Sequence, residues 1–222
     1  MSLKEKLDAF RADVESGKRI PKSVVEALHK STSELIASGQ ANRAKRVGDK
    51  APGFALENTD GQIVRLPDLL AQGPLVLTFY RGVWCPYCNM ELQALEQARG
   101  DIEARGGQVI ALSMQTAPNS RKSIKQNKLG FPILMDPRGE VANAFGLRFA
   151  LPDYLIEIYK NVFKNDLPII NDDPSWTLPM PARYVIGPDG NIAYAEVNPD
   201  YTCRPEPFEL FPVLERLTAQ AA

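Results

Sequence analysis

Two cysteines separated by two residues are the feature of this sequence best suited to carry chemistry. Cys85 and Cys88 stand in the motif Trp-Cys-Pro-Tyr-Cys (84–88), directly after the apolar run 75–80 and where a helix is expected to begin. Residues three apart at a helix start share one face, so the two sulfurs can come within bonding distance. The spacing therefore predicts a dithiol that cycles to a disulfide.

Cys85 is the expected nucleophile of the pair. The first turn of a helix has unpaired N–H groups and the positive end of the helix dipole, and both favour a thiolate there. The dipole contributes about 0.3–1 kcal/mol, less than one pKa unit, whereas an ordinary cysteine has a pKa of about 8.5. Backbone donors and the nearby Arg81 are expected to supply the rest. Pro86 suits the first helical turn, and Tyr80 and Trp84 are expected to wall the pocket.

Strands and helices are predicted to alternate through the middle of the chain. The order is strand 75–80, helix 90–102, strand 109–114, helix 120–127, strand 131–135 and helix 140–145. Hairpins are predicted at 54–64 and 184–197, and a closing helix at 207–217. Such alternation favours an α/β core with parallel strands.

Two further segments lie outside this alternation. Residues 1–44 are predicted to form an N-terminal helical extension, a hairpin whose apolar stripe packs on the main domain or on a second subunit. The remaining residues, 45–222, are predicted to form one domain. An insertion around 148–176 interrupts it with a helix and an irregular loop rich in Pro, Asp and Asn.

Composition excludes several classes of function. Formal net charge is −1, so we expect no nucleic-acid partner. No apolar stretch approaches the roughly 18–20 residues of a membrane helix, and the first residues lack the apolar core of a secretory signal. Three cysteines do not make a paired disulfide framework, which leads us to expect a cytoplasmic location and no membrane.

We expect no metal and no cofactor. A structural zinc site needs four ligands. Cys85, Cys88, Cys203 and His29 would make that number, but the chain has no second spaced pair of ligands. His29 is instead expected to be a surface or packing residue.

Three sequence stretches resemble one known family. The segments 79–89 (Phe-Tyr-Arg-Gly-Val-Trp-Cys-Pro-Tyr-Cys-Asn), 48–56 and the tail 198–207 are similar to the alkyl hydroperoxide reductase/thiol-specific antioxidant family, and within it to the peroxiredoxin-like proteins. The resemblance covers about residues 45–215. It implies a thioredoxin-like fold, with a central mixed sheet flanked by helices, and it puts Cys85 at the position of the peroxide-attacking cysteine.

The sequence also departs from the family pattern. Peroxiredoxins typically carry Pro-x-x-x-Thr-x-x-Cys, and here Thr78 and Gly82 stand at the Pro and Thr positions. The family's later Arg position is occupied by Pro181, where thioredoxin-type reductases have a cis-proline packed against the disulfide. We therefore expect a cis Met180–Pro181 bond facing the cysteines. Arg81 and Arg183 are the candidates to replace the missing Arg.

The resemblance implies a thiol peroxidase. Cys85 would attack a hydroperoxide, Cys88 would resolve the sulfenic acid to a disulfide, and thioredoxin, glutaredoxin or glutathione would reduce it. Tyr80, Arg81, Trp84 and Pro181 are the expected substrate pocket. The alternative is a thiol-disulfide oxidoreductase without peroxidase activity, and a further one is a redox-responsive binding protein whose N-terminal hairpin docks a partner. A homodimer is left open.

Cys203 is predicted to be dispensable, because Cys88 is the nearer partner of Cys85 in the chain. Replacing it by serine should leave turnover unchanged, and mass mapping of the oxidised wild-type protein should find a Cys85–Cys88 disulfide. A dominant bond from Cys203 to Cys85, or between two Cys203 residues, would refute this.

Overall fold

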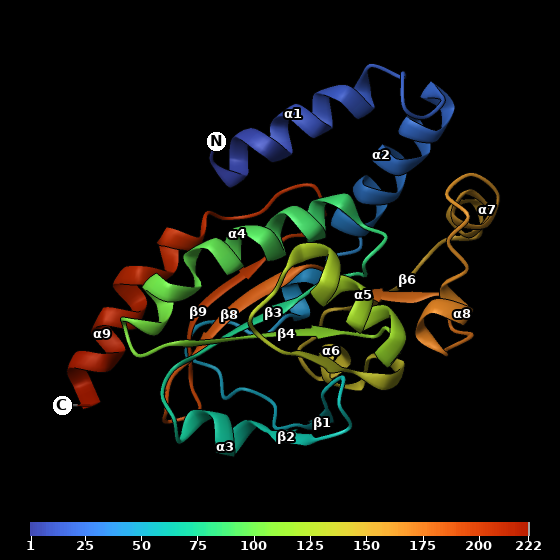
Figure 1. Cartoon of the computed structure of the whole chain (residues 1–222). Helices are drawn as coiled ribbons and strands as arrows, with labels where there is room; N and C mark the ends of the chain where they lie inside the picture. The colour runs from blue at the N-terminus through green and yellow to red at the C-terminus, as the bar shows by residue number, and fades with distance from the viewer. Residues whose placement is uncertain (222) are drawn as a thin grey trace.

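A mixed five-stranded sheet forms the centre of the protein (Figure 1). The computed structural model describes residues 1–221. The strands lie in the order β5-β4-β3-β8-β9, with bounds β3 Leu75–Phe79, β4 Gln108–Ser113, β5 Ile133–Met135, β8 Ala182–Ile186 and β9 Ile192–Val197. The first three are parallel, while β8 runs antiparallel to β3 and β9 antiparallel to β8. The predicted thioredoxin-like α/β fold is confirmed.

The central strand β3 is buried on both faces of the sheet. Leu75, Leu77 and Phe79 point into one core, whereas Val76 and the following Tyr80 point into the other. Helices α4 (Pro86–Glu103) and α9 (Phe211–Ala221) cover the Val76 side, and α3 (Leu66–Leu70) and α6 (Glu140–Ala144) pack on the opposite side. A strand covered by helices on both faces reads as a continuous apolar run, as the sequence does here.

The other predicted elements are also present. The hairpin at 54–64 is β1 (Ala55–Glu57) with β2 (Ile63–Arg65), and the helix at 120–127 is α5 (Ala117–Asn127). Short 3-10 turns lie at Gln40–Arg43, Pro137–Gly139 and Pro207–Leu210, the last leading into α9.

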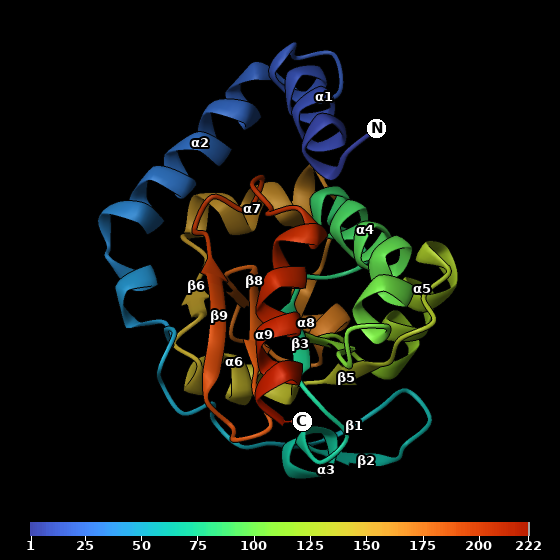
Figure 2. The ribbon, with the colours of Figure 1, turned by 90° about the vertical axis from the view of Figure 1, so that its left-hand side faces the viewer.

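The N-terminal hairpin packs on the main body of the protein. Helices α1 (Leu3–Glu15) and α2 (Lys22–Ala37) arch over the end of the sheet where α4 begins (Figure 2). Leu3 and Leu7 are buried in the same core as α4 and α9. The carboxylate of Glu206 accepts the Lys4 N–H at 2.8 Å, which ties the start of α1 to the C-terminal tail. The hairpin thus packs on the main domain, which is the first of the two predicted alternatives.

The insertion contains more structure than predicted. Its helix is α7 (Asp153–Asn161), followed by α8 (Leu167–Asn171). Strands β6 (Arg148–Ala150) and β7 (Thr177–Pro179) pair antiparallel at its two ends, a small sheet that the sequence analysis missed because each strand has only three residues. Tyr154 of α7 donates a hydrogen bond to Glu34 of α2 at 2.6 Å, so the insertion and the hairpin lie together.

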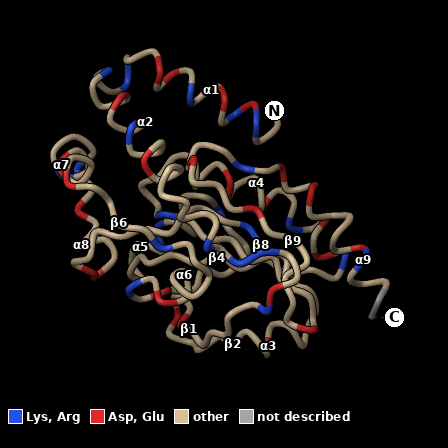
Figure 3. Tube along the Cα trace, turned by 180° about the vertical axis from the view of Figure 1, so that it is seen from behind, with Lys and Arg blue, Asp and Glu red and all other residues tan. Residues whose placement is uncertain are grey.

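Charged residues of both signs are spread along the outer helices. Basic and acidic residues alternate along α1 in Figure 3, as expected for a chain with a net charge of −1. Among residues 1–221, no helix combines the length and the apolar character that crossing a membrane requires. The division into an extension (1–44) and a domain (45–222) stays a prediction.

Candidate active site

The two cysteines lie at the start of α4, as predicted. Cys85 is the N-cap residue, with extended backbone, and Pro86 occupies the first helical turn. The Cys85 N–H donates to the Gly82 carbonyl at 3.0 Å, and its own carbonyl accepts from the Asn89 N–H at 3.1 Å. Cys85 is 2% exposed and Cys88 is fully buried. Both are free thiols in this structure.

The loop before Cys85 is held by Trp84 and by a polar network. A Cβ added at Gly82 would lie 2.3 Å from the Trp84 Nε1 atom, and the φ of Gly82 is +155°. The indole therefore fills the space that the family's threonine side chain would need. The Val83 N–H donates to Gln115 Oε1 at 2.8 Å, and Gln115 Nε2 donates to the Tyr80 hydroxyl at 2.9 Å. Tyr80 thus supports the loop through Gln115.

The two sulfurs differ sharply in acidity. Burial raises the pKa of Cys85, but hydrogen bonds from the Cys88 thiol and N–H and the guanidinium groups of Arg81 and Arg204 outweigh it, and the pKa falls to about 6. Burial and the charge on Cys85 raise the pKa of Cys88 well above its usual value. At neutral pH the pair is therefore a thiolate at Cys85 and a thiol at Cys88.

Arg81 is a buried cation without a carboxylate. It is 4% exposed, and its guanidinium donates to the Tyr159 hydroxyl. The guanidinium carbon lies 4.1 Å from the ring centroid of Tyr201 and 5.1 Å from that of Trp84. Within residues 1–221 no carboxylate pairs with it and its Nε has no hydrogen-bond acceptor. The positive charge of Arg81 lowers the pKa of the Cys85 thiol, so the Cys85 thiolate is the anion that balances it.

A second basic cluster lies beside Cys88. Glu91 of α4 receives Arg183 Nη2 at 2.9 Å on one oxygen and the Arg204 guanidinium on the other. Arg204 Nη2 also donates to Cys88 Sγ at 3.5 Å. The prediction for Arg183 placed it near the sulfurs, and it reaches them only through this cluster. Arg204 was missed as a site residue, although it lies in the tail 198–207 that carries the resemblance.

Cys85 opens into an aromatic cavity of about 420 Å³, which we call the sulfur pocket. Its walls come from the N-terminal hairpin, the start of α4 with the loop before it, the insertion and the tail. They include Phe10, Trp84, Tyr159, Phe163 and Tyr201. The charged residues on its lining are Arg81 and, at the exposed rim, Arg19. Sequence reasoning missed Tyr159 and Phe163 because they reach the site from the insertion, about 75 residues along the chain from Cys85.

The prediction of a cis bond before Pro181 is wrong. In the described part of the chain every peptide bond is trans, Met180–Pro181 included. The Met180 N–H donates to the Leu147 carbonyl at 2.9 Å, extending the β6–β7 pairing, so this backbone is already paired within the protein. Pro181 lines a neighbouring cavity together with Arg81, rather than the sulfur pocket.

Comparison with known proteins shows the family of this chain. Residues 47–195, more than half of the chain, match the AhpC/TSA family. The chain belongs to this family. The crystal structure of peroxidoxin BcpB from Mycobacterium tuberculosis superposes with a TM-score of 0.60 at 20% identity, covering 78% of this chain and 97% of BcpB, which shows the shared fold.

The curated relatives include a thiol-disulfide oxidoreductase and a peroxiredoxin. The thiol-disulfide oxidoreductase ResA of Halalkalibacterium halodurans is 28% identical over 120 residues, 54% of this chain and 67% of ResA. The 1-Cys peroxiredoxin PER1 of Triticum aestivum is 24% identical over 165 residues, 71% of this chain and 66% of PER1. The chain thus spans about two thirds of the length of these relatives. It is a thiol-dependent redox enzyme of the AhpC/TSA family.

The Cys85 thiolate should be visible in a pH titration. We expect the ultraviolet thiolate absorbance of the reduced protein to rise with a midpoint near pH 6, because the folded pKa of Cys85 is about 6. Arg81→Met should raise this midpoint by about one pH unit or more, since it removes a facing positive charge. Arg19→Met, at the exposed rim of the same pocket, should leave it unchanged.

Two outcomes would contradict this assignment. One is a midpoint near the usual cysteine pKa of about 8.5. The other is a titration at pH 6 that persists in Cys85→Ser, which would assign the low pKa to a different group.

Proposed function

We propose that this protein is a thiol peroxidase that reduces hydroperoxides with Cys85 and resolves the product with Cys88. The Cys85 thiolate attacks the terminal peroxide oxygen, the O–O bond breaks, and the alkoxide leaves and takes up a proton as an alcohol. Cys85 is then a sulfenic acid. The Cys88 thiol condenses with it, forming the disulfide and releasing water. An external dithiol returns both electrons and both protons.

One observation carries the proposal. A buried cysteine thiolate lies on the lining of an aromatic pocket, beside a guanidinium whose Nε has no partner within residues 1–221. A peroxide is small enough for this pocket, and its oxygen atoms can accept the free Nε–H of Arg81. Positioned donors stabilise the negative charge that develops on the leaving oxygen. Arg81 would thus supply what the family's Thr and Arg supply elsewhere.

The protonation states of the two cysteines support the roles proposed for them. A thiolate at Cys85 is the nucleophile, and a protonated Cys88 does not repel it. Cys88 Sγ receives a hydrogen bond from Arg204. This bond positions the sulfur of Cys88 for its reaction with the sulfenic acid on Cys85. The reductants that the family resemblance implies for such a disulfide are thioredoxin, glutaredoxin or glutathione.

The second candidate is a thiol-disulfide oxidoreductase without peroxidase activity. The similarity to ResA and the Cys-x-x-Cys spacing favour it. One feature weighs against it. The Met180 N–H is already bonded to Leu147 and cannot pair with an extended substrate.

Stopped-flow oxidation distinguishes the two candidates. Reduced wild-type protein should react with hydrogen peroxide and with an alkyl hydroperoxide at least about a hundredfold faster than free cysteine, because the Cys85 thiolate is formed and its leaving group is stabilised. Cys85→Ser should not react. Cys88→Ser should complete one oxidation and leave a sulfenic acid that a dimedone probe traps on Cys85.

A rate no better than that of free cysteine with both peroxides would reject the peroxidase. If the same preparation then reduced a protein disulfide rapidly, the oxidoreductase would take its place. Trapping the sulfenic acid on Cys88 would reverse the assigned roles.

A further inference from the structure

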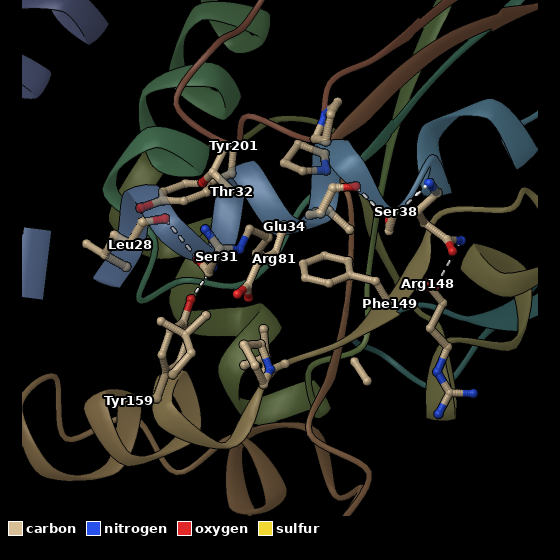
Figure 4. A pocket seen from close by; sticks show the side chains of 18 residues that line it. Leu28, Ser31, Thr32, Glu34, Ser38, Arg81, Arg148, Phe149, Tyr159 and Tyr201 are labelled. Atoms are coloured by element: carbon tan, nitrogen blue, oxygen red, sulfur yellow. Dashed lines mark hydrogen bonds between the residues drawn. The ribbon is translucent and has the colours of Figure 1, made fainter. Parts of the chain in front are cut away.

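A second cavity, shown in Figure 4, also has Arg81 on its lining. Its volume is about 540 Å³, and we call it the α2–α7 cavity because α2, β6 and α7 wall it. Ser31, Leu35 and Ser38 line it from α2, and Phe149, Leu151 and Leu155 from the insertion. Neither sulfur lies on its lining. The hairpin and the insertion, two segments outside the alternating core, thus enclose one space.

The two cavities share one wall. Arg81, Tyr159, Tyr201 and Leu28 line both. In Figure 4 the Arg81 side chain lies among the α2 side chains, with Tyr159 on the facing side and joined to it by the drawn hydrogen bond. A molecule in either cavity can therefore contact the Arg81 guanidinium.

The redox cycle changes the charge balance at this wall. In the reduced protein Cys85 and Arg81 line the same sulfur pocket, and the positive charge of Arg81 stabilises the Cys85 thiolate. Formation of the Cys85–Cys88 disulfide removes that negative charge and leaves a buried guanidinium with only the Tyr159 hydroxyl and aromatic faces around it. Arg183 and Arg204 differ, because both contact the Glu91 carboxylate, whose charge does not depend on the sulfurs. A buried cation without an anion is costly, so the oxidised protein gains most from an anion at Arg81.

We propose that the α2–α7 cavity binds an amphipathic organic monocarboxylate, and that the oxidised protein binds it more tightly than the reduced one. The carboxylate pairs with Arg81, and the hydrocarbon body lies against Phe149, Leu151 and Leu155. The cavity volume falls in the range of small-molecule sites, about 300–1,000 Å³. The inference rests on the Cys85–Cys88 redox cycle of the proposed function, but not on which oxidant drives it.

The cavity also selects against a second negative charge. Glu34 lines it from α2, and its carboxylate accepts from the Tyr154 hydroxyl at 2.6 Å. Arg148, at the β6 end, already bonds to Thr177 at 2.9 Å and Ser175 at 3.2 Å. A dicarboxylate would place its second group near Glu34 without a free cation to receive it. The ligand class is therefore a monoanion with an apolar body.

Calorimetric titration with octanoate tests the proposal. The protein is oxidised with diamide or reduced with dithiothreitol, and thiol counting verifies each state before octanoate is added. We expect binding to the oxidised protein to be about tenfold tighter, about 1.4 kcal/mol. By linkage, saturating octanoate should lower the reduction potential of the disulfide by about 30 mV. Octanol, which lacks the charge, should show no preference between the two states.

Three variants locate the bound octanoate. Ser31→Phe fills the α2–α7 cavity from α2 and should weaken binding at least about tenfold. Ala37→Phe makes a similar enlargement at the exposed end of the same helix, on neither cavity lining, and should bind octanoate normally. Ile20→Trp narrows only the sulfur pocket and should also leave binding unchanged.

Several results would overturn the inference. These are equal affinity in both redox states, equal preference for octanol, no binding, or loss of binding in Ile20→Trp instead of Ser31→Phe. No peroxide enters the experiment, so inactivity as a peroxidase leaves its result unaffected. Failure of diamide to form the Cys85–Cys88 disulfide, seen at thiol counting, would overturn both the redox cycle and this site.

Discussion

The burial of Arg81 is the constraint on which the rest of the site depends. A guanidinium that is 4% exposed has lost its water, and no carboxylate among the described residues replaces that water. Aromatic faces stabilise such a cation by about 2 kcal/mol or more when it is desolvated, which offsets part of the cost. Tyr201 and Trp84 supply these faces, and the Tyr159 hydroxyl supplies an acceptor. Arg81 still requires an anion beside it, and Cys85 supplies that anion by losing its thiol proton.

This single charge connects parts of the chain that are far apart. The tail brings Tyr201, the insertion brings Tyr159, and the end of β3 brings Arg81 itself. The hairpin closes the same space from outside through Phe10 of α1. The extension and the insertion therefore contribute directly to the electrostatics of the sulfur, because they exclude the solvent that would otherwise screen Arg81.

The cluster of Glu91 with Arg183 and Arg204 is a second source of positive charge near the sulfurs. One carboxylate receives two guanidinium groups, so the cluster carries a net positive charge close to Cys88. Arg204 of this cluster lowers the pKa of Cys85. The hydrogen bonds from Arg183 and Arg204 to Glu91 also fix the start of α4 against β8 and the tail. Because breaking a buried ion pair costs about 3–5 kcal/mol, these groups form one structural unit that few substitutions would leave intact.

Local sequence signals predicted most of the fold but only part of the site. The run 75–80 and the Cys-x-x-Cys spacing carry their own periodicity, so β3, α4 and the N-cap position of Cys85 follow from them. Tyr159 and Arg204 give no such signal, because their roles come from the folding back of distant segments. At Pro181, by contrast, the sequence led to a prediction that is wrong. A position matched to thioredoxin-type reductases implied a cis bond. The bond is trans, and the Met180 N–H beside it continues the β6–β7 pairing, which the sequence did not reveal.

The pH dependence of stability tests most directly whether Cys85 is the counter-charge of Arg81. The pKa of Cys85 is about 6 in the folded protein, below the value of about 8.5 expected in the unfolded chain. Its stabilising contribution is therefore present at high pH and is lost as the pH falls through about 6. We expect the unfolding free energy of the reduced wild type, measured with denaturant against Cys85→Ser, to gain about 2 kcal/mol between pH 6 and pH 8. Parallel stability curves for the two proteins over this range would contradict a thiolate at Cys85.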